Sequence, residues 1–231
     1  MLSARTHVGK TAFALNMAGR MASMNNKVLF ASLEQGVFVV PRIESMIRGN
    51  LPESLYILES TTMPTIDQLI ESSHNMPEKM DLICIDHLHF IKREGKGGVE
   101  DVDQMILDIQ RLSKQLEMPV LVIAHVKKLN ADRAPTMDDL RDSSMLSQVP
   151  SVVMFLHRKE ATEDMLINGF LENKGQLIVA KNRVTGKTGM LQYDLLPTGE
   201  MRFEPKVRMY APTKPVPTAT KPVELDDNDL F

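Results

Sequence analysis

The chain has 231 residues, of which 43% are hydrophobic and 25% charged, a composition typical of a globular protein with a sizeable buried core. Its single cysteine, Cys84, excludes an intramolecular disulfide and a zinc site built from several cysteines, as expected in a reducing cytoplasm. The net charge is −3, but four acidic residues between positions 224 and 229 carry −4, which leaves +1 for residues 1–223. This nearly neutral body neither favours nor excludes a nucleic acid as partner.

The chain also lacks the sequence signals of a membrane or exported protein. No run reaches the roughly 18 apolar positions of a membrane span, and the N-terminus is not a charged segment followed by an apolar one. We therefore expect a soluble, cytoplasmic protein without a membrane partner.

From residue 11 onward, helical periodicity alternates with short apolar runs, which is typical of parallel βαβ units. We expect helices at 11–22, about 38–48, after Pro64 and at 102–116, and strands at 27–32, 54–58, 81–86, 119–125, 151–157, 176–181 and 190–195. The glycine-containing segment TGKTG at 185–189 predicts the turn between the last two strands. The pattern predicts an α/β fold with a mainly parallel central sheet, flanked by helices and ending in a β-hairpin.

Two polar segments, 92–101 and 127–144, are expected to be loops on the same side of the sheet. Long ordered loops inside a compact domain are commonly functional. Residues 1–210 are predicted to form the domain. Residues 211–231 are predicted to be a flexible linker rich in proline and threonine, which ends in an acidic tip and Phe231.

Gly9, Lys10 and Thr11 match the end of the phosphate-loop pattern G-x-x-x-x-G-K-[ST]. In such a loop backbone N–H groups and the following helix N-terminus hold phosphates, the lysine reaches the β and γ oxygens, and the hydroxyl binds Mg²⁺. The first glycine of the pattern is replaced by Ala4. On these residues alone, a Gly-Lys pair at an ordinary strand-to-helix turn is an equally good interpretation.

Two carboxylates stand at the ends of apolar strands that lie further along the chain than the phosphate loop. DLICID ends in Asp86, and FASLE ends in Glu34. The carboxyl ends of parallel strands are where open α/β sheets bind ligands, so Asp86 is a candidate to orient Mg²⁺ and Glu34 a candidate general base. Taken singly, Asp86 could cap a helix and Glu34 could be a solvated surface residue.

Six segments together resemble the RecA-like motor domain of DnaB-family replicative DNA helicases, a fold of the P-loop NTPase class. They are ARTHVGKTAFALNMA at 4–18, FASLE at 30–34, ICIDHLHFI at 83–91, IAHVKK at 123–128, PTMDDLRDSS at 135–144 and KNRVTGKTG at 181–189. The resemblance covers about residues 1–205, and the fourth and sixth segments are most similar to the phage primase-helicases. An Ala-Arg opening of the phosphate loop occurs in bacterial members, so Ala4 fits the family.

The resemblance implies a role for each matching residue in the hydrolysis of ATP. The expected nucleotide ligands are Ala4, Arg5, Gly9, Lys10, Thr11 and Ala12, and the expected Mg²⁺ ligands are Thr11 and Asp86. Glu34 is expected to activate water, and His125 to sense the γ-phosphate. Lys181 and Arg183 are expected to reach the active site of a neighbouring subunit, which predicts a homo-oligomer, most simply a ring hexamer. The ordinary interpretation of His125 is a hydrogen-bonded histidine at a strand end, and that of Lys181 and Arg183 is a pair of solvated surface residues.

The resemblance also implies a single-stranded DNA partner, held by a loop of the family pattern DLRESG. The residues expected to contact DNA are Arg133, Leu140, Arg141, Asp142 and Ser144, of which Ser144 replaces the family's glycine. Such binding would be salt-dependent and tolerant of sequence. A charged loop is also commonly just solvated.

The acidic tip and terminal Phe231 resemble tails that dock on a replisome protein, while a disordered solubilising end is the ordinary alternative. Only MLSAR stands where the family carries more of a first strand, a linker helix and an N-terminal domain. The expected function is a replicative DNA helicase motor that couples ATP hydrolysis to translocation on single-stranded DNA. The alternatives are an ATP-binding replication accessory that does not form a ring, and a recombinase-like filament ATPase.

Overall fold

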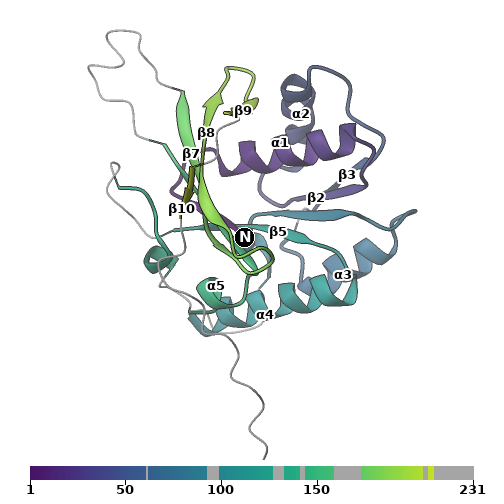
Figure 1. Ribbon diagram of the computed structural model, residues 1–231. Coiled ribbons are helices and arrows are strands. Elements are labelled where there is room, and N and C mark those ends of the chain that lie inside the picture. The colour runs from purple at the N-terminus through teal and green to yellow at the C-terminus, as the bar shows by residue number, and fades with distance from the viewer. Residues whose placement is uncertain are drawn as a thin grey trace, which may run out of the picture.

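The computed structural model describes residues 1–60, 62–92, 99–126, 133–140, 144–158, 173–204 and 208–210 (Figure 1). The strands are β1 (Leu2–Ala4), β2 (Val28–Ser32), β3 (Leu55–Glu59), β4 (Leu82–Asp86), β5 (Val120–His125), β6 (Val152–His157), β7 (Lys174–Asn182), β8 (Thr188–Leu195), β9 (Met201–Phe203) and β10 (Arg208–Tyr210). The α-helices are α1 (Lys10–Ser23), α2 (Val39–Ile47), α3 (Ile66–His74), α4 (Val99–Gln115) and α5 (Ser144–Gln148). Short 3₁₀ helices are η1 (Gly36–Phe38), η2 (Leu88–Phe90) and η3 (Met137–Leu140).

All described strands belong to one sheet, in the order β10-β8-β7-β6-β1-β5-β4-β2-β3, with β9 paired to β8. The run from β6 to β3 is parallel throughout. Strands β7 to β10 add an antiparallel extension at one side, and β7 and β8 form a hairpin. The predicted fold class, a mainly parallel sheet that ends in a β-hairpin, is confirmed.

The sheet is covered on both faces, with α1 and α2 on one face and α3, α4 and α5 on the other (Figure 1). Consecutive residues of the central strands alternate between these two layers, since side chains point to opposite faces with a period of two. In β4, for example, Ile83 and Ile85 belong to the core under α3 and α4, and Leu82 and Cys84 to the core under α1 and α2. Burial on both faces explains why these strands read as continuous apolar runs in the sequence.

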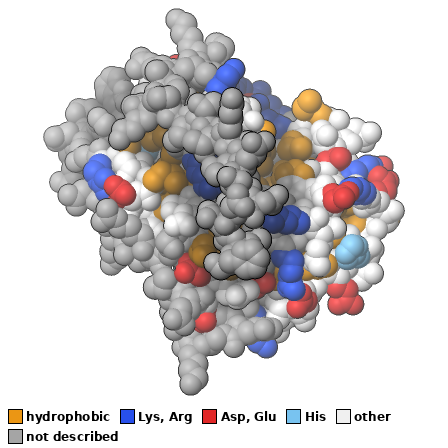
Figure 2. Space-filling model, turned by 60° about the horizontal axis from the view of Figure 1, so that its bottom comes forward, with side chains coloured by type: hydrophobic (Ala, Val, Ile, Leu, Met, Phe, Trp, Pro, Cys, Tyr) orange, Lys and Arg blue, Asp and Glu red, His pale blue; other side chains and the backbone are white. Residues whose placement is uncertain are grey.

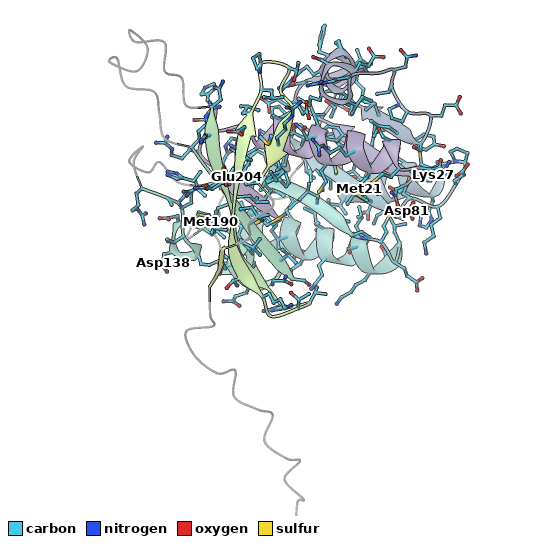
Figure 3. The ribbon with its side chains drawn as sticks, turned by 45° about the horizontal axis from the view of Figure 1, so that its top comes forward. Met21, Lys27, Asp81, Asp138, Met190 and Glu204 are labelled. Carbon is cyan, nitrogen blue, oxygen red and sulfur yellow. The ribbon has the colours of Figure 1, made fainter. Side chains whose placement is uncertain are left out.

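Local hydrogen bonds set where helices begin and how the strands are aligned. Thr65 caps α3 in a capping box: the Gln68 N–H donates to the Thr65 hydroxyl at 3.2 Å, and the Gln68 side chain accepts from the Thr65 N–H at 2.9 Å. At the amino ends of β2 and β4, Lys27 and Asp81 lie side by side (Figure 3). The Lys27 N–H donates to the Asp81 carboxylate at 2.8 Å, and the Asp81 N–H donates to the Lys27 carbonyl at 2.7 Å.

A buried asparagine ties the hairpin region to α1. The Asn16 amide donates to the Gly199 carbonyl at 2.8 Å and accepts from the Met201 N–H at 2.9 Å. Only 4% of Asn16 is exposed. Because the partners are backbone groups far along the chain, this one side chain fixes the turn between β8 and β9 against the helix that follows the phosphate loop.

The expected helices and strands all occur, with ends shifted by a few residues. The main differences are additions: β1, β9 and β10 are three-residue strands, too short to give a period in the sequence. The expected loop 92–101 ends in helix, because α4 begins at Val99, and the expected loop 127–144 contains η3. Residues 93–98, 127–132 and 141–143 of these loops, and residues 211–231 of the tail, lie outside the described residues. None of the described helices is long and apolar enough to cross a membrane.

Candidate active site

The carboxyl ends of β1, β5, β4 and β2 bring together side chains that are distant in the sequence. Ala4 is the register partner of His125, and Ser32 is the register partner of Asp86. Because these strands are parallel, all four positions lie at the same edge of the sheet. The loop from β1 to α1 and the segment after β2, which carries Glu34, meet at this edge.

The phosphate-loop lysine is buried in its own loop. Lys10 is 7% exposed, and its Nζ donates to the carbonyls of Ala4 at 3.0 Å and Arg5 at 2.7 Å. Burial lowers the pKa of Lys10 to about 8, although the carboxylates of Asp86 and Glu34 oppose this shift. The ammonium group therefore lies at the centre of the loop, next to the helix N-terminus at Gly9.

The loop uses glycine only where its backbone requires it. Gly9, at the N-cap of α1, has φ +110°, a conformation that residues with a Cβ rarely adopt. Ala4 is not among the residues with positive φ, and it is fully buried in β1. An alanine is therefore compatible with the position that the general motif assigns to glycine. Ala12, also expected at this site, is buried in the first turn of α1.

Asp86 presents a buried carboxylate that is only partly paired. It is 2% exposed, its side chain has a hydrogen bond with Thr11, and its Oδ1 has no hydrogen-bond partner among the described residues. Burial, and secondarily the charge of Glu34, raises the pKa of Asp86 to about 6. A buried carboxylate oxygen without a partner beside a threonine hydroxyl fits a hard divalent cation such as Mg²⁺, which prefers oxygen ligands. Ser32 Oγ is a second buried atom of this kind in the described residues.

Glu34 and His125 are joined through a residue that the sequence analysis did not assign. His87 Nε2 lies 3.5 Å from Glu34 Oε2 and 3.4 Å from His125 Nε2. Burial lowers the pKa of both histidines to about 4, with neighbouring positive groups as the smaller cause. Both rings are therefore neutral near pH 7, and the Glu34–His87 contact joins a carboxylate to a neutral imidazole although its distance would suit an ion pair. The peptide bond between Asp86 and His87 is cis.

Glu34 faces open space on its other side. Its side chain is 43% exposed and borders a cavity of about 400 Å³. The cavity is lined by Leu33, Glu34, Gln35, Gly36, Phe38, Arg42, Glu59 and Ser60. Arg42, whose guanidinium donates to the Gln35 side chain, also lowers the pKa of Asp86 somewhat. The carboxylate of Glu34 is thus accessible to water, as a general base must be.

His87, His89 and Arg42 are residues of this site that the sequence analysis missed. His87 stands directly after the acid of DLICID, and two more histidines of the site follow at 89 and 125. That run of histidines around strand ends was the available signal for His87. Arg42 lies on α2, and no sequence motif includes it.

Lys181 and Arg183 lie away from the other predicted catalytic residues. Lys181 Nζ donates to the carbonyls of Ser147 and Gln148 at 2.7 Å each, so it caps the end of α5. Arg183 is exposed and follows Asn182, the register partner of Val152 at the start of β6. Both positions are therefore near the amino edge of the parallel strands, opposite the phosphate loop.

The segment predicted to contact DNA is described only in part. The Arg133 guanidinium pairs with the carboxylate of Asp139, which also accepts from the Thr136 N–H at 2.7 Å. Leu140 is 2% exposed and belongs to the core, which leaves only its backbone for a ligand. Arg141 and Asp142 lie outside the described residues, and Ser144 begins α5. Figure 2 shows basic and acidic side chains intermixed on one face.

Comparison with known proteins identifies relatives along most of the chain. The family of DnaB-like helicase C-terminal domains matches residues 39–204. The chain is 26% identical over 216 residues to a probable plasmid replicative DNA helicase of Chlamydia psittaci, covering 79% of this chain and 46% of that protein. It is 25% identical over 228 residues to the replicative DNA helicase DnaB of Geobacillus stearothermophilus, covering 83% and 49%. The chain thus spans about half the length of these curated relatives.

Solved structures agree in fold. One of them, an ATPase domain, superposes with a TM-score of 0.68 at 21% identity, covering 87% of this chain and 82% of that one. A DnaB-like replicative helicase, studied with primase, superposes with a TM-score of 0.69 at 20% identity, covering 87% and 57%. At these identities the likeness establishes the fold alone.

Proposed function

This chain belongs to the family of DnaB-like helicase C-terminal domains, and we propose that it is the motor of a replicative DNA helicase. In this proposal it hydrolyses Mg²⁺-ATP and couples hydrolysis to translocation on single-stranded DNA, and thereby to duplex unwinding. The names of the relatives, which are replicative DNA helicases, support the assignment.

The observation that carries the proposal is the arrangement around Asp86. A buried carboxylate with one oxygen unpaired, hydrogen-bonded to Thr11, lies close enough to Lys10 for their charges to shift each other's pKa. Burying a charge without full pairing is costly, so such groups mark sites where a ligand completes the pairing. A phosphate loop beside a cation site is the arrangement that phosphoryl transfer requires.

Each residue has a role in this chemistry. Lys10 and the backbone N–H groups of the loop would hold the phosphates, and Thr11 and Asp86 would hold Mg²⁺, which supplies charge neutralisation between the phosphates. Glu34 would take the proton of the attacking water, since its carboxylate is accessible beside the cavity. His125, at the end of β5, would respond to the γ-phosphate and pass its loss to the segment that follows.

Arg183 is proposed to act on the nucleotide of a neighbouring subunit. Arg183 directly follows Asn182, which pairs with Val152 at the amino end of β6. Ala4, where the phosphate loop begins, directly follows Ser3, which pairs with Phe155 near the carboxyl end of β6. The two edges are thus four strand residues apart, roughly 13 Å, before the phosphate loop begins. An arginine at the far edge of the sheet cannot serve its own phosphate loop, which supports a shared site and a homo-oligomer, proposed to be a hexamer.

A mixing experiment tests the shared site. Arg183→Ala and Glu34→Ala chains are each expected to be inactive alone, and their mixture is expected to recover part of the DNA-stimulated ATPase activity. Recovery follows because a mixed interface can combine an intact Glu34 with an intact Arg183. The matched control mixes Glu34→Ala with Asp86→Asn, which damages the same half of the site and should restore nothing.

The mass of the particle tests the assembly directly. Light scattering is expected to give about six subunits when a Mg²⁺-ATP analogue and single-stranded DNA are present. A chain that stays monomeric and lacks ATPase activity under these conditions would refute the motor and favour a replication accessory. The same preparation, with residues 224–231 removed, tests whether the acidic tip serves a separate replisome partner: assembly and ATPase activity should persist.

A further inference from the structure

We propose that His87 is a positioning residue that makes the orientation of Glu34 depend on the state of His125. The inference rests on the proposed function and deepens it, because it assigns the connection between the γ-phosphate sensor and the general base. Its basis is the place of one ring nitrogen between two functional side chains.

The hydrogen bonds of the His87 ring show which of its nitrogens carries the hydrogen. The backbone N–H of His89 donates to His87 Nδ1 at 3.3 Å, which makes Nδ1 an acceptor. The single ring hydrogen therefore resides on Nε2. His87 Nε2 forms a hydrogen bond with His125 Nε2 at 3.4 Å and lies 3.5 Å from Glu34 Oε2.

Packing holds the His87 ring in this orientation. The residue is 7% exposed, and its ring meets the rings of Phe90 and His125 edge-on, with centroids 4.8 Å and 4.7 Å away. A ring enclosed in this way keeps its Nε2 between Glu34 and His125. Glu34, by contrast, is half-exposed at the border of the cavity, so its carboxylate has room to reorient.

One N–H between two acceptors can serve only one of them fully. Both contacts are longer than a good N–H donor distance, as catalytic hydrogen bonds commonly are without substrate. While His125 Nε2 accepts the hydrogen, Glu34 is left to solvent. When His125 turns to another partner, the same N–H is available to one oxygen of Glu34 and orients the other toward water. The base is thereby positioned only in the state that His125 reports.

Kinetics of two His87 variants test the role. His87→Phe keeps a ring in the packed position but removes the donor, and His87→Gln keeps an amide donor near the place of Nε2. We expect His87→Phe to lower the DNA-stimulated kcat by about 10- to 100-fold, the usual effect of losing a residue that orients a reacting group. KM and the affinity for a non-hydrolysable ATP analogue should stay within about threefold, because nucleotide binding does not use the donor. His87→Gln should recover most of kcat.

Two controls separate this role from a structural one. His74→Phe replaces an exposed histidine at the end of α3 and should leave kcat unchanged. Thermal unfolding reports whether His87→Phe remains folded, and His87→Gln tests the same position if it does not. A fold defect would lower the active fraction and would not be repaired by an amide. Wild-type kcat in a folded His87→Phe chain would overturn the inference.

A double-mutant cycle with His125→Phe tests the connection itself. Both substitutions interrupt the same step, so the combined loss of kcat should be smaller than the product of the single losses by at least about threefold. Losses that multiply would mean that the two histidines act independently, and the proposal would fail.

A spectroscopic measurement tests the arrangement without hydrolysis. ¹⁵N NMR of the histidine-labelled chain should find the Nε2–H tautomer for His87, and an Nδ1–H tautomer would overturn the inference. Wild-type chains without Mg²⁺-ATPase activity would overturn the proposed function as well. An active wild type that lacks the His87 effects would overturn this inference alone.

Discussion

Neutralising Asp86 should stabilise the chain in the absence of Mg²⁺ and nucleotide, although it removes a residue that hydrolysis needs. Its carboxyl has a pKa of about 6 in the fold, against 3.8 as the reference value. The unfolded chain therefore ionises at lower pH than the folded chain. Ionisation of the buried Asp86 carboxyl therefore lowers the stability of the folded state, and a neutral amide at this position avoids that loss.

The sign and size follow from the two pKa values. Below pH 3.8 the carboxyl is protonated in both states and has no effect. As pH rises from there through about 6, the unfolded chain loses its proton first and stability falls. Above that window the loss is constant at about 3 kcal/mol, because one pKa unit corresponds to about 1.36 kcal/mol. At pH 5 the loss is about half of this.

Urea unfolding in EDTA, followed by circular dichroism, measures the effect. Asp86→Asn is expected to be more stable than wild type by about 3 kcal/mol at pH 8 and by about half of that at pH 5. The amide can still accept from Thr11. Glu53→Gln, which neutralises an exposed carboxylate, should change stability by less than about 0.5 kcal/mol at either pH. A variant that is less stable than wild type at pH 8, or a pH-independent difference, would refute the reasoning.

Three further substitutions test other parts of the structure. Asn16→Ala should destabilise the chain by about 2 to 4 kcal/mol in urea unfolding, because it leaves the partly buried Gly199 carbonyl and the buried Met201 N–H unpaired; an effect below about 0.5 kcal/mol would contradict the tie between α1 and the hairpin. Thr65→Ala should cost about 1 kcal/mol through loss of the capping box, and Thr65→Ser, which keeps the hydroxyl, should cost much less. Lys10→Met should lower ATPase activity by more than about 100-fold while thermal unfolding stays cooperative, since the ammonium acts on phosphate charge; an active variant would remove the phosphate loop from the mechanism.

The residues of the candidate site could be predicted where a charged or polar side chain stands near the end of an apolar strand. Lys10, Thr11, Glu34, Asp86 and His125 each stand at a fixed offset from an apolar run, and parallel strands bring such positions to one edge. The structure does bring these side chains together. The sequence offered no equivalent rule for His87, because a histidine after an acid becomes informative only when its neighbours in space are known.

The roles of Lys181 and Arg183 illustrate the opposite case. The sequence analysis grouped them with the catalytic residues, but the register of β7 against β6 puts them at the far edge from Lys10 of the same chain. Within one chain Lys181 binds the carbonyls at the end of α5. Their catalytic role stays a prediction that depends on a second subunit.

By itself the sequence determined the order of helices and strands, the parallel character of the sheet and the edge at which its charged residues gather. These features depend on local periodicity and on the fact that the carboxyl ends of parallel strands all lie at the same edge of a sheet. Only the tertiary structure decided which charged groups are buried. It also decided which ring nitrogen lies between the general base and the histidine at the end of β5. Burial and hydrogen-bond geometry arise between segments far apart in the chain, so Asp86 with its unpaired oxygen and His87 between Glu34 and His125 were settled by packing.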